Sequence, residues 1–355
     1  TGETAWQVVW SHHHLLLDGW SMPIVFRGVM RALAAIARGE SPDLPGDHGF
    51  RDHVARLAKA DPARAADFWR DRLADAPEAT FPAAGRRRGD GTGMAMRSLD
   101  LPPAPAARLA ESARRHGVTQ STLVNAAWAV LLGRYGGTLD VLYGVTVSGR
   151  PQDLDGSDGM VGMFINTLPV RAALDPAATL ADWLPAFQAG FADLAAHQDS
   201  RLVDIQSWSG RPRQQPLFEA ILVYENYPVA SEVRASAGLA VGAVTAREQN
   251  NFPLSLYVLP GDGLRLELMW DRARLDDGAA DALLAELAAL LEALADPARE
   301  RIADLLPDAP DPAVIGSAGP VGPPVHRRIL NHAEAEPGRF AVIAEDATLT
   351  YGELA

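Results

Sequence analysis

The sequence predicts a mixed α/β protein built of two lobes. Three observations favour this fold class: strand-like and helical segments succeed one another along the chain, a polar stretch at residues 85–93 interrupts them, and 48% of the 355 residues are hydrophobic. Segments that alternate between these two periodicities typically pack as layers of helix on sheet. A chain of this length and hydrophobic content can bury a large core and can hold more than one domain.

The predicted elements begin with a strand at residues 5–14, where Trp and Val favour β structure. Period two places one set of side chains on a common face, opposite His13: Trp6, Val8, Trp10, His12 and His14. Further along, Ser21 is suited to cap a helix that has Pro23 in its first turn and ends near Gly39. His14 is therefore expected at a strand-to-helix junction.

The rest of the chain continues to mix helices and strands. Helices are predicted at residues 50–59, 62–73, 104–116, 119–135 and 277–294. Strands are predicted at 96–101, 141–147, 163–171, 219–226, 253–259 and 263–270, with a turn at 148–151. A stretch rich in Pro, Gly and Ala at 306–324 indicates a linker, after which a helix at 326–335 and strands at 340–344 and 348–351 are predicted.

The composition argues against several functional classes. The formal net charge of −13 disfavours binding to nucleic acid or to anionic lipid through a basic face. The chain has no Cys, which removes disulfides, thiolate nucleophiles and Cys-ligated zinc. No apolar run approaches the roughly 20 residues that cross a bilayer, and no N-terminal signal segment is recognisable. Proteins or small molecules are the expected partners, and a cytoplasmic location is expected.

The segment SHHHLLLDGWS at residues 11–21 holds the candidate catalytic residue, His14. Imidazole suits acyl transfer to an amine because its ordinary pKa of about 6.5 lets it accept or orient the proton of the nucleophile. Asp18 can lock the loop by pairing with a buried Arg, and Gly19 allows close approach of the backbone to a ligand. Two other interpretations stay open: ordinary core or surface histidines, or a metal site formed by His12 and His14.

Five strings of the sequence together resemble motifs of one enzyme family. They are HHLLLDG at 13–19, VGMFINTLPVR at 161–171, PLF at 216–218, YENYP at 224–228 and LTYGEL at 349–354. The first resembles the HHxxxDG signature of condensation domains of nonribosomal peptide synthetases, which belong to the chloramphenicol-acetyltransferase-like superfamily. The next three are similar to later motifs of the same domains, in the same order. The last resembles the first core motif of an adenylation domain, which commonly follows condensation in these synthetases.

This resemblance implies an organisation for the whole chain. Residues 1–88 would be the remainder of a condensation N-lobe, residues 89–304 the C-lobe, residues 305–324 a linker and residues 325–355 the start of an adenylation domain. The implied fold is the two-lobed chloramphenicol-acetyltransferase-like fold with an incomplete first lobe, because the first two family motifs would precede Thr1. A segment truncated in this way is expected to be inactive when expressed alone.

The resemblance also implies a role for each residue of the site. His14 would be the catalytic or substrate-orienting histidine in a tunnel between the lobes. Its structural support would come from His13, Asp18, Gly19 and Arg150, with Asp18 and Arg150 forming an ion pair. Trp20 and Asn226 are candidates for lining the tunnel. No metal is implied.

The implied reaction is amide formation between donor and acceptor aminoacyl or peptidyl thioesters. Phosphopantetheine arms of upstream and downstream carrier domains would deliver both substrates, so no cofactor would be bound by this segment itself. The adenylation domain would lie in the same chain, and neither nucleic acid nor membrane is an implied partner. Two alternatives are a CoA-dependent HxxxDG acyltransferase and a non-catalytic recruitment domain of the same fold. The joined amino acids, and amide against ester formation, stay open.

Overall fold

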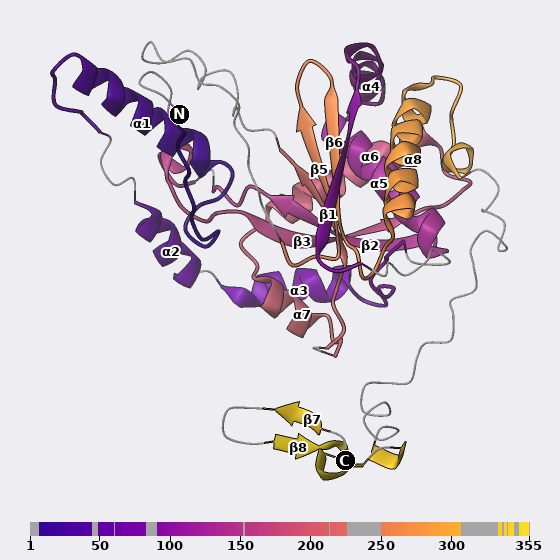
Figure 1. Cartoon of the computed structure of the whole chain (residues 1–355). Coiled ribbons are helices and arrows are strands. Elements are labelled where there is room, and N and C mark those ends of the chain that lie inside the picture. Colours follow the sequence, from indigo (N-terminus) through magenta and orange to yellow (C-terminus); the bar gives the residue numbers. More distant parts are fainter. Residues whose placement is uncertain are drawn as a thin grey trace. The chain divides into compact units, whose positions relative to one another are not determined.

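The computed structural model describes residues 7–44, 49–59, 61–82, 91–151, 153–212, 214–225, 250–306, 333–335, 337–338, 340–343 and 348–354. The chain divides into two compact units, Thr1–Asp311 and Pro312–Ala355 (Figure 1). The predicted lobe boundary between residues 88 and 89 and most of the predicted linker fall outside the described residues.

A mixed six-stranded sheet forms the centre of the first unit. Its strands lie in the order β1-β6-β5-β4-β2-β3. Their bounds are β1 Met94–Leu101, β2 Asp140–Val147, β3 Asn166–Ala173, β4 Ala220–Tyr224, β5 Leu254–Pro260 and β6 Leu264–Asp271. Strand β4 runs parallel to both β2 and β5, whereas the other neighbours are antiparallel. A parallel neighbour requires a long crossover connection, and the chain between β2 and β4 contains β3 and two helices.

One face of the sheet is covered by the helices α4 (Pro103–His116), α5 (Gln120–Gly136), α6 (Leu180–Ala195) and α8 (Asp277–Ala295), as Figure 1 shows. Helix α5 is the centre of this layer, because every residue from Thr122 to Gly133 is buried. A helix that is apolar around its whole circumference is stable only when neighbours enclose it, and α5 contacts α4, α6, α8 and β2. The mixed α/β class predicted from the sequence is therefore confirmed.

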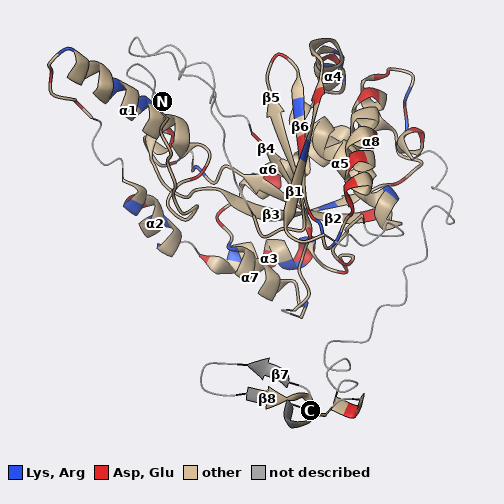
Figure 2. Ribbon diagram, viewed as in Figure 1, with Lys and Arg blue, Asp and Glu red and all other residues tan. Residues whose placement is uncertain are grey.

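Helix α8 carries only acidic charged residues (Figure 2), and arginines of its neighbours compensate them. The pairs are Arg97 with Asp281 at 3.3 Å, Arg272 with Asp277 at 3.1 Å, and Arg134 with Glu286. The Arg134–Glu286 pair is mostly buried and the other two are half-exposed. Opposite charges thus face each other where α8 packs on the sheet layer.

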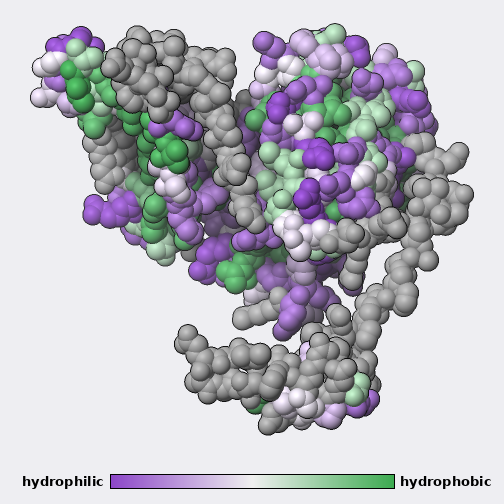
Figure 3. Space-filling view, viewed as in Figure 1, coloured by the Kyte–Doolittle hydropathy of each residue, from purple (hydrophilic) through white to green (hydrophobic). Residues whose placement is uncertain are grey.

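The segments before the sheet form three further helices, α1 (Ser21–Ala37), α2 (Phe50–Lys59) and α3 (Pro62–Arg72). Helix α3 contacts α7 (Leu202–Trp208), which in turn contacts β3. Helix α1 leaves Val29, Leu33 and Ile36 exposed, and apolar surface is visible along it in Figure 3. No helix within the described ranges is both long and apolar enough to cross a bilayer.

Four sequence-based expectations about the elements require correction. Residues 7–14 are not a strand, because no described segment forms a β-ladder with them and Val8 and Val9 are more than four-fifths exposed. Ser21 lies inside α1 and its hydroxyl bonds elsewhere, so Trp20 occupies the cap position without a side-chain cap bond. The strand predicted from residue 163 begins at Asn166. Helices α6 and α7 were not predicted at all, since neither showed a recognisable start signal.

The second unit contains a short antiparallel pair of strands, β7 (Phe340–Ile343) and β8 (Thr348–Thr350), followed by one helical turn, α10 (Tyr351–Leu354). Both predicted strands are present, but Tyr351 begins the helical turn and does not extend the strand. Of the predicted helix at 326–335, only residues 333–335 are described, and these are helical.

Candidate functional site

A tight turn directly before α1 presents His14. The turn is closed by backbone hydrogen bonds from Leu16 N–H to His13 O at 3.0 Å and from Leu17 N–H to His14 O at 3.3 Å. The Nδ1 atom of His13 accepts a further bond from Leu15 N–H at 3.1 Å. The His13 imidazole therefore stabilises the turn internally, while the His14 side chain is exposed.

Asp18, at the end of the same turn, is almost completely buried at 1% exposure. Its Oδ1 accepts hydrogen bonds from the backbone N–H of Ser21 at 2.8 Å and from the Ser21 hydroxyl at 2.7 Å. Its Oδ2 accepts the backbone N–H of Phe164 at 3.1 Å. Both carboxylate oxygens are satisfied, as a buried charge requires. Asp18 thereby joins the first turn of α1 to the chain just before β3.

Arg150 supplies the opposite charge. Its Nη2 lies 3.3 Å from Asp18 Oδ1, and its Nη1 donates to the carbonyl oxygens of Met160 at 3.0 Å and of Ser157. The guanidinium also lies over the Phe164 ring, 4.2 Å from the centroid, where a cation and an aromatic face attract each other. Arg150 is 8% exposed, so the ion pair is removed from water on both sides.

A glycine allows Arg150 to reach this position. Gly149 has φ +63, and a Cβ there would lie 1.7 Å from the carbonyl oxygen of Phe164. Only glycine combines a left-handed backbone with so close an approach at low cost. The turn predicted at residues 148–151 thus packs directly against the backbone of the segment that carries Phe164.

The extended segment from Met160 to Ile165 has two different faces. Met160, Gly162 and Phe164 are buried, whereas Val161, Met163 and Ile165 are exposed or half-buried. A Cβ on Gly162 would lie 2.2 Å from the Phe50 ring, so this position also requires a glycine. Successive side chains of an extended chain point to opposite sides. One face of the segment therefore contacts the Asp18–Arg150 pair, and the other is available to a ligand.

A buried histidine, His53 of α2, completes the inner face. Its ring lies 4.5 Å from that of Phe164 and 5.8 Å from that of Phe50. Burial lowers the pKa of His53 below its ordinary value, and the charges of Arg56 and Arg150 lower it further against the smaller opposing effect of Asp199. The imidazole is therefore uncharged near neutral pH and packs as an aromatic side chain.

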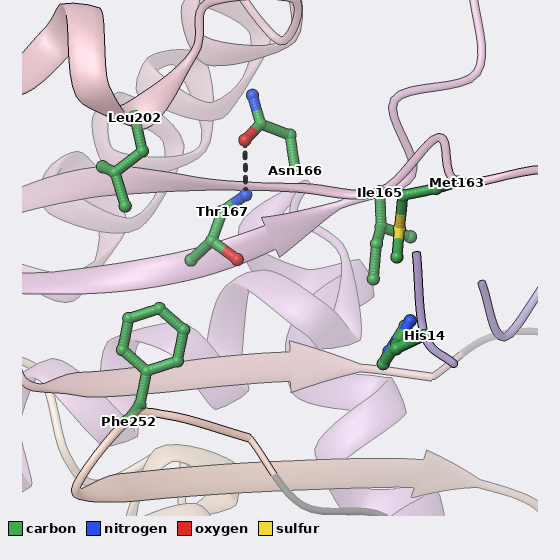
Figure 4. A pocket seen from close by; sticks show the side chains of 7 residues that line it. All are labelled: His14, Met163, Ile165, Asn166, Thr167, Leu202 and Phe252. Atoms are coloured by element: carbon green, nitrogen blue, oxygen red, sulfur yellow. Dashed lines mark hydrogen bonds between the residues drawn. The ribbon is translucent and has the colours of Figure 1, made fainter. Parts of the chain in front are cut away.

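The outer face of the segment borders a cavity of about 280 Å³ beside His14. The cavity is lined by His14, Met163, Ile165, Asn166, Thr167, Leu202 and Phe252. In Figure 4, Met163 and Ile165 lie on the side of His14, and Leu202 and Phe252 lie at the other end. The turn before α1, the start of β3, α7 and the residues preceding β5 therefore meet at one site.

Asn166 uses its side-chain amide to hold the cavity wall together. Its Nδ2 donates to the carbonyl oxygens of Gln198 at 2.8 Å and Ser200 at 2.7 Å, and its Oδ1 accepts Thr167 N–H at 2.9 Å. The Ser200 hydroxyl in turn accepts the indole N–H of Trp69 in α3 at 2.8 Å. These bonds join β3, the loop before α7 and α3, so the wall is supported from behind.

The structure brings together four of the predicted site residues: His13 and His14 in the turn, and Asp18 with Arg150 in the buried pair beneath it. Gly19 and Trp20 are half-buried and lie outside the set that lines the cavity. Asn226 falls outside the described residues. In the part of the chain that the structure describes, no three His, Asp or Glu side chains gather as a metal site would require.

Several residues of the site were not singled out from the sequence. Met163, Ile165 and Thr167 belong to a motif that was noted, and its alternation of buried and accessible positions was a signal that could have assigned them to the cavity. Leu202 and Phe252 carry no comparable signal, because their proximity to His14 arises only from the tertiary fold. His53 lies in an ordinary amphipathic helix and was equally hidden.

Comparisons with known proteins agree with this geometry. A family model described as "Condensation domain" matches residues 1–311. The chain is 38% identical over 370 residues to a part of the linear gramicidin synthase of Brevibacillus parabrevis, an alignment that covers 99% of this chain and 5% of that protein. The chain thus spans about a twentieth of the length of this relative.

Solved structures give the same fold. The first condensation domain of the calcium-dependent antibiotic synthetase, in complex with a substrate analogue, superposes with a TM-score of 0.67 and 22% identity, over 82% of this chain and 64% of that one. Holo-AB3403, a four-domain nonribosomal peptide synthetase bound to AMP and glycine, gives a TM-score of 0.71 and 18% identity, over 95% of this chain and 28% of that one. At these identities the likeness concerns the fold.

Proposed function

This chain belongs to the condensation-domain family of nonribosomal peptide synthetases, and from that premise we propose that it joins two carrier-bound aminoacyl or peptidyl thioesters through an amide bond. The observation that carries the proposal is the position of His14. Its imidazole is exposed at the edge of a cavity of about 280 Å³, on a turn that the buried Asp18–Arg150 pair anchors four residues later. The imidazole is thus presented to the cavity from a firmly held base.

The proposed step is attack of the acceptor's neutral α-amine on the carbonyl carbon of the donor thioester. A C–N bond forms and the C–S bond breaks, which yields an amide and a free thiol. The proton lost by the amine passes to the imidazole of His14 and then to the departing sulfur, so charge and atoms balance. General base assistance of this kind typically contributes about 10² to 10⁴ in rate, and holding both substrates in place contributes further.

The roles proposed for the other residues follow from their contacts. His13 accepts the Leu15 N–H bond that shapes the turn, and Asp18 and Arg150 neutralise each other in the interior. They position His14 and do not touch the substrates. Gly19, Trp20 and Asn226 stay proposals for the tunnel wall, since the first two lie outside the cavity's lining and the third lies outside the described residues.

We also propose the surroundings in which the reaction takes place. Carrier domains on either side would present the two thioesters on phosphopantetheine arms, and the chain after the predicted linker at 305–324 would begin an adenylation domain. Residues 1–88 and 89–304 would be the two lobes between which the arms enter. The match of holo-AB3403 to 95% of this chain, beyond residue 311, supports continuation into a neighbouring synthetase domain. Such an assembly would work in the cytoplasm.

The experiment is replacement of His14 by Ala in the longer synthetase polypeptide that carries this chain. Products bound to the carrier domains are measured by mass spectrometry after loading of both substrates. We expect loading to be unchanged and amide formation to fall by about 10² to 10⁴. His12→Ala is the matched control, because His12 is also exposed and does not line the cavity.

Two outcomes would contradict the proposal. Normal transfer by the His14→Ala protein would remove His14 from the chemistry. Equal product formation when acyl-coenzyme A replaces the donor carrier would instead favour a CoA-dependent acyltransferase.

A further inference from the structure

We infer that the cavity beside His14 receives the side chain of the acceptor aminoacyl group, and that it selects acceptors whose side chains are uncharged and apolar. This inference rests on the proposed function. It goes further by naming the substrate class, which for this site means branched aliphatic side chains in preference to polar or charged ones.

The composition of the lining supports the selection. Of the seven lining residues, four present only apolar or thioether groups: Met163, Ile165, Leu202 and Phe252. None carries a permanent charge. A carboxylate or ammonium group entering such a cavity loses water and finds no opposite charge, which is costly. An aliphatic group gains free energy there by leaving water.

The polar atoms of the lining do not change this balance. The Asn166 amide is already engaged by Gln198, Ser200 and Thr167 N–H. The Thr167 hydroxyl lies 3.4 Å from that of Thr146 on β2. The polar side chains that border the cavity are therefore His14, which the chemistry uses, and hydroxyl and amide groups that are held within the wall.

The geometry indicates which substrate the cavity serves. If the acceptor amine is at the His14 imidazole, its α-carbon and side chain are only one bond further away. Figure 4 shows Met163 and Ile165 on the side of His14, with Leu202 and Phe252 beyond. A side chain leaving the α-carbon toward these residues enters the apolar part. The volume of about 280 Å³ is close to the lower limit of small-molecule sites, about 300 Å³, which suits one side chain better than a peptide.

The alternation of the segment before β3 makes the inference testable. Met163 faces the cavity, whereas its neighbours Gly162 and Phe164 face the buried ion pair. A substitution at Met163 therefore changes the cavity without touching the support of His14. Val161 is exposed in the same segment and does not line the cavity, so it offers a matched control.

The experiment measures kcat/KM for amide formation by the longer synthetase polypeptide with three acceptors supplied as carrier-bound thioesters: leucyl, asparaginyl and aspartyl. These side chains have the same number of heavy atoms and the same branching, so polarity and charge are the variables. We expect leucyl to exceed asparaginyl by at least about tenfold and aspartyl to be slowest. Met163→Lys should raise the aspartyl-to-leucyl ratio by about tenfold or more, whereas Val161→Lys should leave the ratio unchanged.

Equal kcat/KM values for the three acceptors would overturn the inference even if Met163→Lys failed to fold. An identical shift for Met163→Lys and Val161→Lys would also overturn it, because the charge would then act from outside the cavity. The proposed function fails by a different sign, namely transfer that does not depend on His14. A protein that needs His14 but ignores the acceptor side chain would retain the function and lose only the selectivity.

Discussion

His14 and Asp18 stand four residues apart in one short motif, yet their surroundings are opposite. His14 is exposed at the edge of a cavity, and Asp18 is 1% exposed within a network of hydrogen bonds. The turn between them leads from solvent to the interior. The comparison teaches that a single motif can divide its residues between reaction and support. The two classes should then respond differently to substitution, which stability measurements can test.

The largest expected effect on stability is that of Asp18→Ala. Removing this carboxylate leaves Arg150 buried without its charge partner, which typically costs about 3 to 5 kcal/mol of unfolding free energy. It also leaves the N–H groups of Ser21 and Phe164 without their acceptor. Urea denaturation followed by circular dichroism measures the change.

The matched control for this experiment is Asp67→Ala. Asp67 pairs with Arg70 at 2.8 Å on the surface of α3, where both side chains are more than half-exposed. Exposed pairs are worth about 0 to 1 kcal/mol. If Asp18→Ala destabilised the protein no more than Asp67→Ala, the buried pair would not be the anchor of the turn.

An intermediate effect is expected from the protonation of His53, on the supported side of the site. The pKa of His53 is lowered by burial and by Arg56 and Arg150. As pH falls through about 6.5, the unfolded chain binds a proton that the folded protein does not yet accept. The free energy of unfolding should therefore be unaffected by His53 above that pH and should decrease as pH falls below it.

Thermal or urea unfolding between about pH 7.5 and about pH 5, the range around the ordinary imidazole pKa, tests this dependence. His53→Gln should make the pH profile flatter than that of the native sequence, and His12→Gln, at an exposed position, should leave it unchanged. Parallel profiles for the native and His53→Gln proteins would show that His53 is not held neutral by its surroundings.

The smallest expected effect on stability is that of His14→Ala. An exposed side chain away from the core typically contributes less than about 0.5 kcal/mol. The same urea titration should give a midpoint close to that of the native sequence, in contrast to Asp18→Ala. A loss comparable to that of Asp18→Ala would abolish the distinction between the two ends of the motif.

Helices with a strong local signal were predictable from the sequence. Asp61 with Pro62 marks the start of α3, and Thr119 marks the start of α5, where its hydroxyl accepts Thr122 N–H. The strand predicted at residues 5–14 shows where such reasoning ends. Favourable residues do not make a strand without a neighbouring strand to complete its hydrogen bonds, and no described segment pairs with residues 7–14 in a sheet.

The site was predictable only where a motif concentrated its residues. The pairing of Asp18 with Arg150 was expected from the resemblance to known motifs, not from spacing, because 132 positions separate the two residues. Arg171, the last residue of the motif before β3's end, has a different role: it pairs with Asp140 at 2.7 Å and binds the carbonyl oxygen of Ala74. Such roles depend on contacts between distant segments, which no local pattern encodes.

The two faces of the segment from Met160 to Ile165 have a consequence for how such a protein can diversify. Gly162 and Phe164 are constrained by the packing of Phe50, Gly149 and the ion pair. Met163 and Ile165, each one residue away from them, border the cavity. Evolution, or an engineer recombining synthetase modules, can therefore vary every second letter of this stretch to suit a new building block. The letters between them preserve the machine that all the building blocks share.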